Sequence, residues 1–164
     1  MELIDILARA GDRPKTTGAM IPHDQLDQFS PPDIRQGLVD YATALPGVFT
    51  GPSQVSEPGS LALRLREPKG PADAFLMPGL DEFGHVHRTG FMHLMLDPQI
   101  INFLTRLGWI EAHPITARDD FFDNIVMLYA PRDAEELEIA RTLLRMSWER
   151  ASGVVRHPGR ARRP

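Results

Sequence analysis

Short strand-like segments that follow one another closely constrain the fold of this chain more than any other feature. In residues 61–65 leucines alternate with smaller or charged residues, the pattern of a half-buried strand. Further strand patterns cover residues 74–77, 83–87, 91–96 and 125–129, and Arg88-Thr89-Gly90 forms a hairpin loop between two of them. Strands joined by short links favour an antiparallel or mixed sheet, because parallel strands need long crossover connections.

Helical patterns lie before, between and after these strands. Ser30, a typical N-cap residue, is followed by Pro31 and predicts a helix over residues 30–45. The same signal at Asp97-Pro98 predicts another helix, which ends at Gly108. Apolar residues at helical spacing predict a short amphipathic helix over residues 2–10 and a long one over residues 133–153. We therefore predict an α+β domain, an antiparallel or mixed β-sheet covered by helices, with a long C-terminal amphipathic helix.

The length of 164 residues fits one domain. We expect an N-terminal helix and linker arm (1–29), the α+β domain (30–153) and a basic flexible tail (154–164). The net charge is −4, and four of the 18 basic residues lie in the tail without any acidic residue, so the body carries −8 and predicts no nucleic-acid partner. The chain has no apolar stretch long enough for a membrane span and no signal-peptide pattern, so we expect a cytoplasmic protein without a membrane partner.

The chain contains no cysteine, which excludes disulfides, a thiolate nucleophile and cysteine-ligated metals. Any metal would have to be held by His, Asp and Glu. The Gly-rich motifs that bind dinucleotides or nucleoside triphosphates are absent, as is the Gly-x-Ser-x-Gly motif of serine hydrolases.

Histidine is the chemistry-bearing residue that clusters along the chain. His85 and His87 point to one face of a strand, and a hairpin with the next strand would bring His93 beside them. His113 follows later, before a proline. This pattern fits a metal site for Zn, Fe or Cu on His85, His87 and His93, a metal-free catalytic pocket, or purely structural histidines. The other two histidines fall in the expected arm and tail, so we expect His23 and His157 to lie outside the site.

Three further residues are candidates for substrate binding. Tyr129 and Arg132 lie between a buried strand and a helix N-terminus, where an anion or enolate can be bound. Arg132 fits equally well as the partner of a nearby carboxylate. Trp109 fits a pocket wall, or simply the core.

Several motifs occur in the order found in one known family. They are Glu82-Phe-Gly-His-Val-His, Phe91-Met-His-Leu, Gly108-Trp followed by His113-Pro, and Leu128-Tyr-Ala-Pro-Arg. Over about residues 45–153 the chain resembles the luciferase-domain family, which includes the fungal luciferases and many small bacterial and fungal proteins.

This resemblance implies a small-molecule enzyme of the oxygenase type. Fungal luciferases oxygenate 3-hydroxyhispidin, an enolic pyrone, with O2 and without an assigned organic cofactor. By this resemblance His85, His87, His93 and His113 are the expected catalytic residues, with a histidine as general base, and Trp109, Tyr129 and Arg132 bind substrate. We expect O2 as co-substrate and no resident cofactor. The N-terminus lacks the family's membrane anchor and the spacing between His87 and His93 is short, so we do not expect light emission.

Two alternatives remain open. One is a metal-dependent enzyme with Zn or Fe on His85, His87 and His93. The other is a non-enzymatic ligand-binding or interaction module that uses the apolar stripe of the last helix or the Met-rich strand 91–96. The sequence does not define the oligomeric state, and a homo-oligomer is compatible with it.

Overall fold

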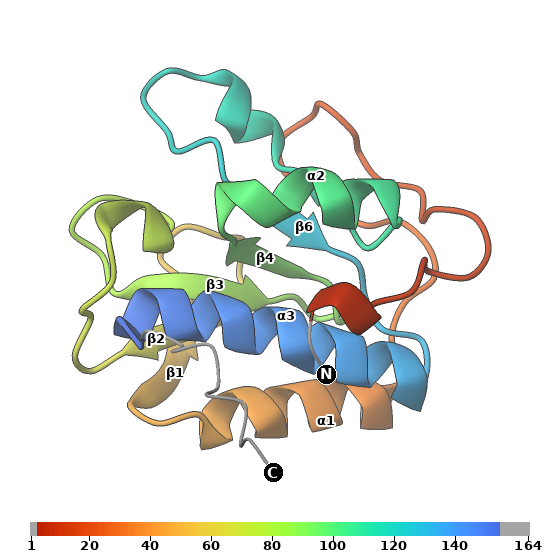
Figure 1. Ribbon diagram of the computed structural model, residues 1–164, viewed down its shortest axis with the longest axis horizontal. Helices are drawn as coiled ribbons and strands as arrows, with labels where there is room; N and C mark the ends of the chain where they lie inside the picture. Colours follow the sequence, from red (N-terminus) through yellow and green to blue (C-terminus); the bar gives the residue numbers. More distant parts are fainter. Residues whose placement is uncertain (1–2, 155–164) are drawn as a thin grey trace, which may run out of the picture.

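The computed structural model describes residues 3–154, which form a six-stranded antiparallel sheet with helices packed on it (Figure 1). The strands are β1 (Val48–Pro52), β2 (Leu61–Leu65), β3 (Glu82–Val86), β4 (Met92–Met95), β5 (Ile110–Ala112) and β6 (Ile125–Leu128), and they lie side by side in the order β1-β2-β3-β4-β6-β5. The helices are α1 (Pro32–Ala44), α2 (Pro98–Arg106) and α3 (Ala134–Ser152). This architecture confirms the predicted α+β class and the long C-terminal helix.

The main core lies between one face of the sheet and the pair α1 and α3, which run side by side (Figure 1). Alternate residues of each strand enter this core, because successive strand side chains point to opposite faces. Leu63, Val86, Leu94 and Val126 are buried there with Leu144 of α3. The opposite face of β3 and β4 carries the histidines.

Capping residues define the ends of the helices as predicted for α2 and α3. The side chain of Asp97 accepts a hydrogen bond from the backbone N–H of Gln99, and that of Asp133 accepts one from Glu136. Gly153 ends α3 with φ of 72°, a left-handed conformation that glycine adopts without a steric cost. Helix α1 begins one residue later than expected, since Pro31 occupies its cap and the Ser30 hydroxyl donates instead to the carbonyl of Pro131.

Three local predictions were wrong. Residues 74–77 form no strand: the segment follows a 3₁₀ turn (Ala72–Ala74) and pairs only through Leu76 N–H to Glu82 O, between Pro71 and Pro78. Strands β1 and β5 were missed because the first contains glycine and proline and the second has three residues. The helix expected over residues 2–10 is a 3₁₀ turn at Leu3–Asp5 (Glu2 lies outside the described residues), because the backbone beyond it pairs with other parts of the chain.

The segment before α1 packs against the domain. The Trp109 indole donates to Leu7 O, and Arg9 N–H donates to Leu107 O. Thr16 and Gln25 form an isolated β-bridge within this segment. The expected tail lies outside the described residues except for Val154.

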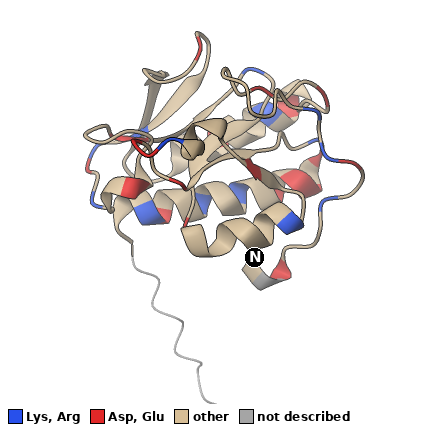
Figure 2. Cartoon of the chain, turned by 90° about the horizontal axis from the view of Figure 1, so that it is seen from above, with Lys and Arg blue, Asp and Glu red and all other residues tan. Residues whose placement is uncertain are grey.

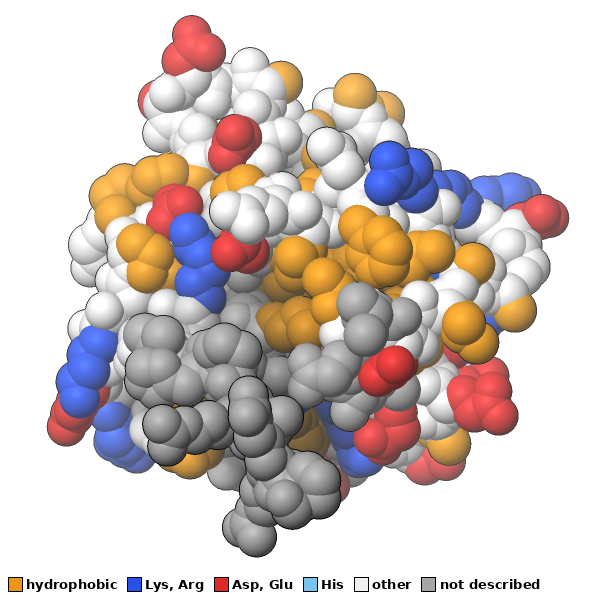
Figure 3. Space-filling view, in the orientation of Figure 1, with side chains coloured by type: hydrophobic (Ala, Val, Ile, Leu, Met, Phe, Trp, Pro, Cys, Tyr) orange, Lys and Arg blue, Asp and Glu red, His pale blue; other side chains and the backbone are white. Residues whose placement is uncertain are grey.

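Charged residues of both signs are scattered over the helices and loops (Figure 2). The face seen in Figure 3 shows a group of apolar side chains near its centre and charged side chains around its edge. None of the helices in residues 3–154 combines the length and apolar character that crossing a membrane requires.

Candidate functional site

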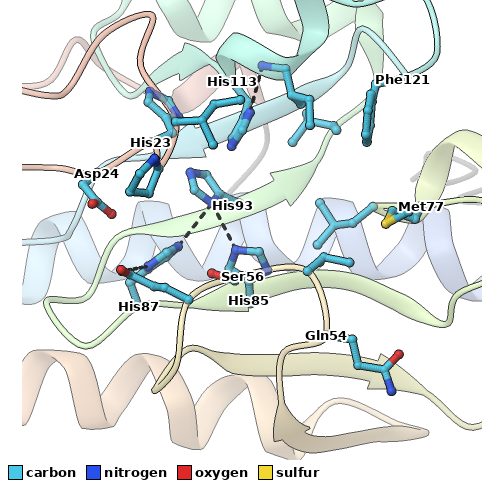
Figure 4. Close-up of a pocket in the computed structure, with 17 residues that line it drawn as sticks. His23, Asp24, Gln54, Ser56, Met77, His85, His87, His93, His113 and Phe121 are labelled. Carbon is cyan, nitrogen blue, oxygen red and sulfur yellow. Dashed lines mark hydrogen bonds and ion pairs between the residues drawn. The ribbon is translucent and has the colours of Figure 1, made fainter.

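The pairing of β3 with β4 brings three imidazoles together, as the hairpin pattern predicted. His85 lies opposite His93 in the antiparallel register, and His87 follows directly after β3. His85 Nε2 lies 3.0 Å from His93 Nδ1, and His87 Nε2 lies 3.2 Å from the same atom. All three side chains are buried. Two neighbouring nitrogens therefore converge on one edge of the His93 ring (Figure 4).

Carboxylates face the outer nitrogens of two of these rings. Glu82, itself 2% exposed, places Oε1 2.9 Å from His85 Nδ1 and accepts a second hydrogen bond from the Ser53 hydroxyl. Glu57 Oε1 lies 3.3 Å from His87 Nδ1. Because a carboxylate accepts hydrogen bonds, each neutral ring carries its proton on Nδ1. The Nε2 atoms of His85 and His87 then present lone pairs to His93.

A fourth histidine, His23, joins the cluster from the segment before α1. The expectation that His23 lies outside the site was wrong: it is 2% exposed and its ring stacks on His93, with centroids 5.4 Å apart. Its Nε2 lies 2.7 Å from Glu111 Oε1, and Glu111 also accepts a hydrogen bond from the Tyr129 hydroxyl. No pattern in residues 11–29 indicates this contact, because it depends on how an irregular segment folds back over the sheet. The other histidine expected to lie outside the site, His157, is not among the described residues.

His113 lies above the cluster at the start of a 3₁₀ turn (Pro114–Ala117). Its ring centroid is 4.6 Å from that of His93 and 4.9 Å from that of His23. Its Nδ1 accepts a hydrogen bond from the backbone N–H of Ile115. The neutral ring therefore carries its proton on Nε2, the opposite tautomer to His85 and His87.

These histidines form one wall of a cavity of about 380 Å³ (Figure 4). The remaining lining is mostly apolar, with a few polar groups from residues 54–57 and Asp24. The apolar lining residues are Ile21, Pro22, Val55, Leu76, Met77, Ile115, Phe121 and Ile125. A concave, largely apolar site with convergent polar groups is the usual form of a small-molecule site.

Burial lowers the pKa of three imidazoles of this wall. Desolvation, assisted by repulsion from His85, His23 and His113, lowers the pKa of His87 to about 3. Desolvation lowers the pKa of His113 to about 4, with smaller effects from His23 and His85. The pKa of His93 is lowered well below its ordinary value, first by burial and then by the surrounding histidines. At neutral pH these three rings are therefore uncharged.

The three expected substrate-binding residues lie outside this cavity lining. Tyr129 is buried and donates to Glu111, so it supports His23 from behind. Arg132 is bound to Glu136 and to the carbonyl of Ala10, which is the carboxylate-paired alternative for this residue. Trp109 is packed in the main core.

Two groups of three imidazoles have nitrogens close enough to bind one cation, and both include His93. The members of one are His85, His87 and His93, and those of the other are His23, His93 and His113; within each group the candidate nitrogens lie within 4.8 Å of one another. Two buried nitrogens in the second group, His93 Nε2 and His23 Nδ1, have no hydrogen-bond partner among residues 3–154.

Comparison with known families identifies part of the chain. Residues 80–147 match the model of the Luciferase domain. This stretch of the chain is similar to the luciferase-domain family. The match confirms the resemblance, over a shorter stretch than the motifs indicated. Comparisons with curated proteins and with solved structures gave no match.

The luciferase-domain match contains only part of the site. His85, His87, His93 and His113 lie inside it, together with Glu82 and Glu111. His23, Asp24 and residues 54–57 lie before it and also line the cavity. The site is therefore built from the family segment and from preceding parts of the chain.

Proposed function

We propose that this protein is an oxygenase-type enzyme that acts on an enolic or aromatic small molecule in the histidine-lined cavity. The observation that carries the proposal is the convergence of buried imidazoles on one wall of a largely apolar cavity. The family match supports the same class of chemistry.

The cavity suits a planar, weakly polar substrate. Its apolar side chains contact the ring system, and the few polar groups near His87 orient the oxygen substituents. A volume of about 380 Å³ lies at the lower end of the range for small-molecule sites, roughly 300–1,000 Å³. A ligand of one or two rings fits this space.

The proposed reaction begins with loss of the enol proton to Nδ1 of His23, a lining residue whose Nε2 faces Glu111 and whose Nδ1 has no hydrogen-bond partner among residues 3–154. The resulting enolate donates one electron to O2, and the two radicals combine to form a carbon–oxygen bond. Return of the proton to the distal oxygen gives an organic hydroperoxide, so one substrate and one O2 yield one product. The apolar walls exclude water from these charged species.

Oxygen uptake with a panel of hydroxypyrones and related enols tests the proposal. We expect uptake by the tag-free protein and its loss in His87→Ala. Arg132→Ala, outside the cavity, should retain it. If no compound binds or stimulates uptake, or if the two variants behave alike, the proposal fails.

A further inference from the structure

We infer that Nε2 of His85, Nε2 of His87 and Nδ1 of His93 bind one divalent first-row transition-metal ion. The inference deepens the proposed function, because a cation at these nitrogens would hold the enolate oxygen of the substrate at the histidine wall of the cavity. It stands on a geometry of its own, and metal binding can be measured without any substrate.

The first argument is a count of protons. Glu82 and Glu57 keep the protons of His85 and His87 on the outer nitrogens, so two lone pairs point at His93 Nδ1. His93 has one proton for both its nitrogens. That proton can satisfy at most one of the two neighbouring lone pairs, although all three rings are buried. A metal ion between the three nitrogens satisfies all of them at once.

The second argument is distance. Zn–N bonds of about 2.0–2.1 Å at tetrahedral angles separate two donor nitrogens by about 3.3–3.4 Å. The two observed separations to His93 Nδ1 are 3.0 and 3.2 Å. Shifts of a few tenths of an ångström would therefore accommodate the ion. Three protein nitrogens leave a coordination position open for a ligand.

The third argument is the surrounding support. Metal-binding histidines usually donate their other N–H to a carboxylate, which orients the ring. Glu82 and Glu57 provide this for His85 and His87. For His93, binding through Nδ1 moves the proton to Nε2, one of two buried imidazole nitrogens without a hydrogen-bond partner among residues 3–154. The other such atom is Nδ1 of the stacked His23, held as an acceptor because Glu111 faces its Nε2.

The same reasoning disfavours the alternative group of His23, His93 and His113. His113 Nδ1 already accepts from Ile115, so its inner nitrogen carries a proton and offers no lone pair. His113 is therefore a neighbour of the metal site rather than a ligand, which makes it a matched control.

Calorimetric titration of tag-free, chelator-stripped protein with Zn²⁺ tests the inference. We expect one Zn²⁺ per chain, an affinity loss of about 100-fold or more in His85→Gln, and a loss of about 10- to 100-fold in Glu82→Gln. His113→Gln should bind within about 3-fold of the parent, because it removes no ligand. No binding by the parent, or equal affinities in His85→Gln and His113→Gln, would overturn the inference.

A second measurement does not depend on the folding of any variant. In imidazole ¹⁵N spectra of the unaltered protein, Zn²⁺ should change the chemical shifts of Nε2 of His85 and His87 and of Nδ1 of His93. The His113 ring should keep its tautomer. Shifts confined to His23 and His113 would contradict the assignment. If the protein binds Zn²⁺ here but consumes no O2 with any enol, the metal site stands and the proposed function fails. If it consumes O2 but binds no metal, the proposed function stands and the metal site fails.

Discussion

Glu82 Oε1 lies 2.9 Å from His85 Nδ1, and both side chains are almost completely buried. This pair joins the edge of the cavity to the sheet, because Glu82 also accepts from the Ser53 hydroxyl on the chain leaving β1. The carboxylate thereby fixes the orientation and the tautomer of the imidazole.

Replacing Glu82 by alanine should lower the stability of the fold. The substitution leaves the His85 N–H and the Ser53 hydroxyl without this buried acceptor, at a cost of about 1–3 kcal/mol in the free energy of unfolding. Urea unfolding measures it. Glu67→Ala, at a side chain that is 77% exposed, should change the same quantity by less than about 0.5 kcal/mol. Equal effects would show that the buried pair contributes nothing.

Gly84→Ala should disturb the β3–β4 pair beneath the histidines. A Cβ at this position would lie 2.5 Å from Leu94 Cδ2 and 2.8 Å from His93 O, and the second of these is backbone. We expect a loss of about 1–3 kcal/mol in thermal or urea unfolding. Gly51→Ala is the matched control in the same sheet, since a Cβ there meets no atom within 4 Å. A Gly84→Ala protein as stable as Gly51→Ala would mean that the strands separate more easily than the structure indicates.

The stability of the protein should fall in the alkaline range through Tyr129. Burial, followed by the hydrogen bond to Glu111, raises the pKa of Tyr129 to about 12. The folded state therefore binds the phenolic proton more tightly than the unfolded chain, whose tyrosines titrate near pH ~10. This contribution is complete below about pH 10 and is lost as the pH rises to about 12, amounting to roughly 2–3 kcal/mol.

Urea unfolding between about pH 9 and about pH 11.5 measures the effect, because this range begins below the unfolded pKa of tyrosine and reaches close to the folded one. Tyr129→Phe should lack this part of the decline, and absorbance titration should show one tyrosine that ionises late. A parent and a Tyr129→Phe protein with parallel pH profiles would contradict the assignment.

Gln25→Ala should loosen the segment that carries His23. The buried Gln25 side chain accepts from the Ala130 N–H and donates to the carbonyls of Asp27 and Gln28. Its loss leaves those buried groups unpaired, so hydrogen exchange in residues 11–29 should speed up while that of β3 and β4 does not change. Leu26→Ala, at a neighbouring side chain that is 54% exposed, is the control. Unchanged exchange in Gln25→Ala would show that other contacts hold the segment.

Glu136→Ala should lower the free energy of unfolding more than Arg132→Ala does. The Glu136 carboxylate is the ion-pair partner of Arg9, which is 8% exposed, and of the more exposed Arg132. Removing it leaves a buried guanidinium uncompensated, at about 3 kcal/mol in unfolding free energy. Arg132→Ala should cost about 1 kcal/mol or less and leave ligand binding in the cavity unchanged. A loss of cavity binding in Arg132→Ala would restore this residue to the site.

The fold was predictable where the pattern is local. The cap and proline at Asp97-Pro98 and the stop at Gly153 are signals within a few residues, and the hairpin over residues 83–96 follows from strand periodicity and one glycine. The convergence of His85, His87 and His93 follows directly from that hairpin. Strand β5 was missed because three residues hold too little periodicity, so its place beside β6 depends on tertiary contacts.

The other half of the site could not be read from the sequence. His23 and Glu111 are 88 positions apart, and neither lies in a pattern that points to the other. Arg132 illustrates the opposite problem. Its position at a helix N-terminus suggests a site for an anionic ligand, but the carboxylate of Glu136, one turn later, is the anion that it binds. Pairings over long separations depend on the packing of irregular segments, which periodicity does not encode.

The lining of the cavity comes from separate parts of the chain. The imidazoles of His85, His87, His93 and His113 come from the segment that defines the family, whereas Ile21, Pro22 and residues 54–57 come from earlier parts. The lining is composite: the matched segment supplies four of the five lining histidines together with Ile115, Phe121 and Ile125, and earlier parts supply His23 and the other lining residues. A fragment cut to the family boundaries would lose these earlier parts, so exchanging residues 21–24 and 54–57 between such proteins is a direct route to altered ligand preference.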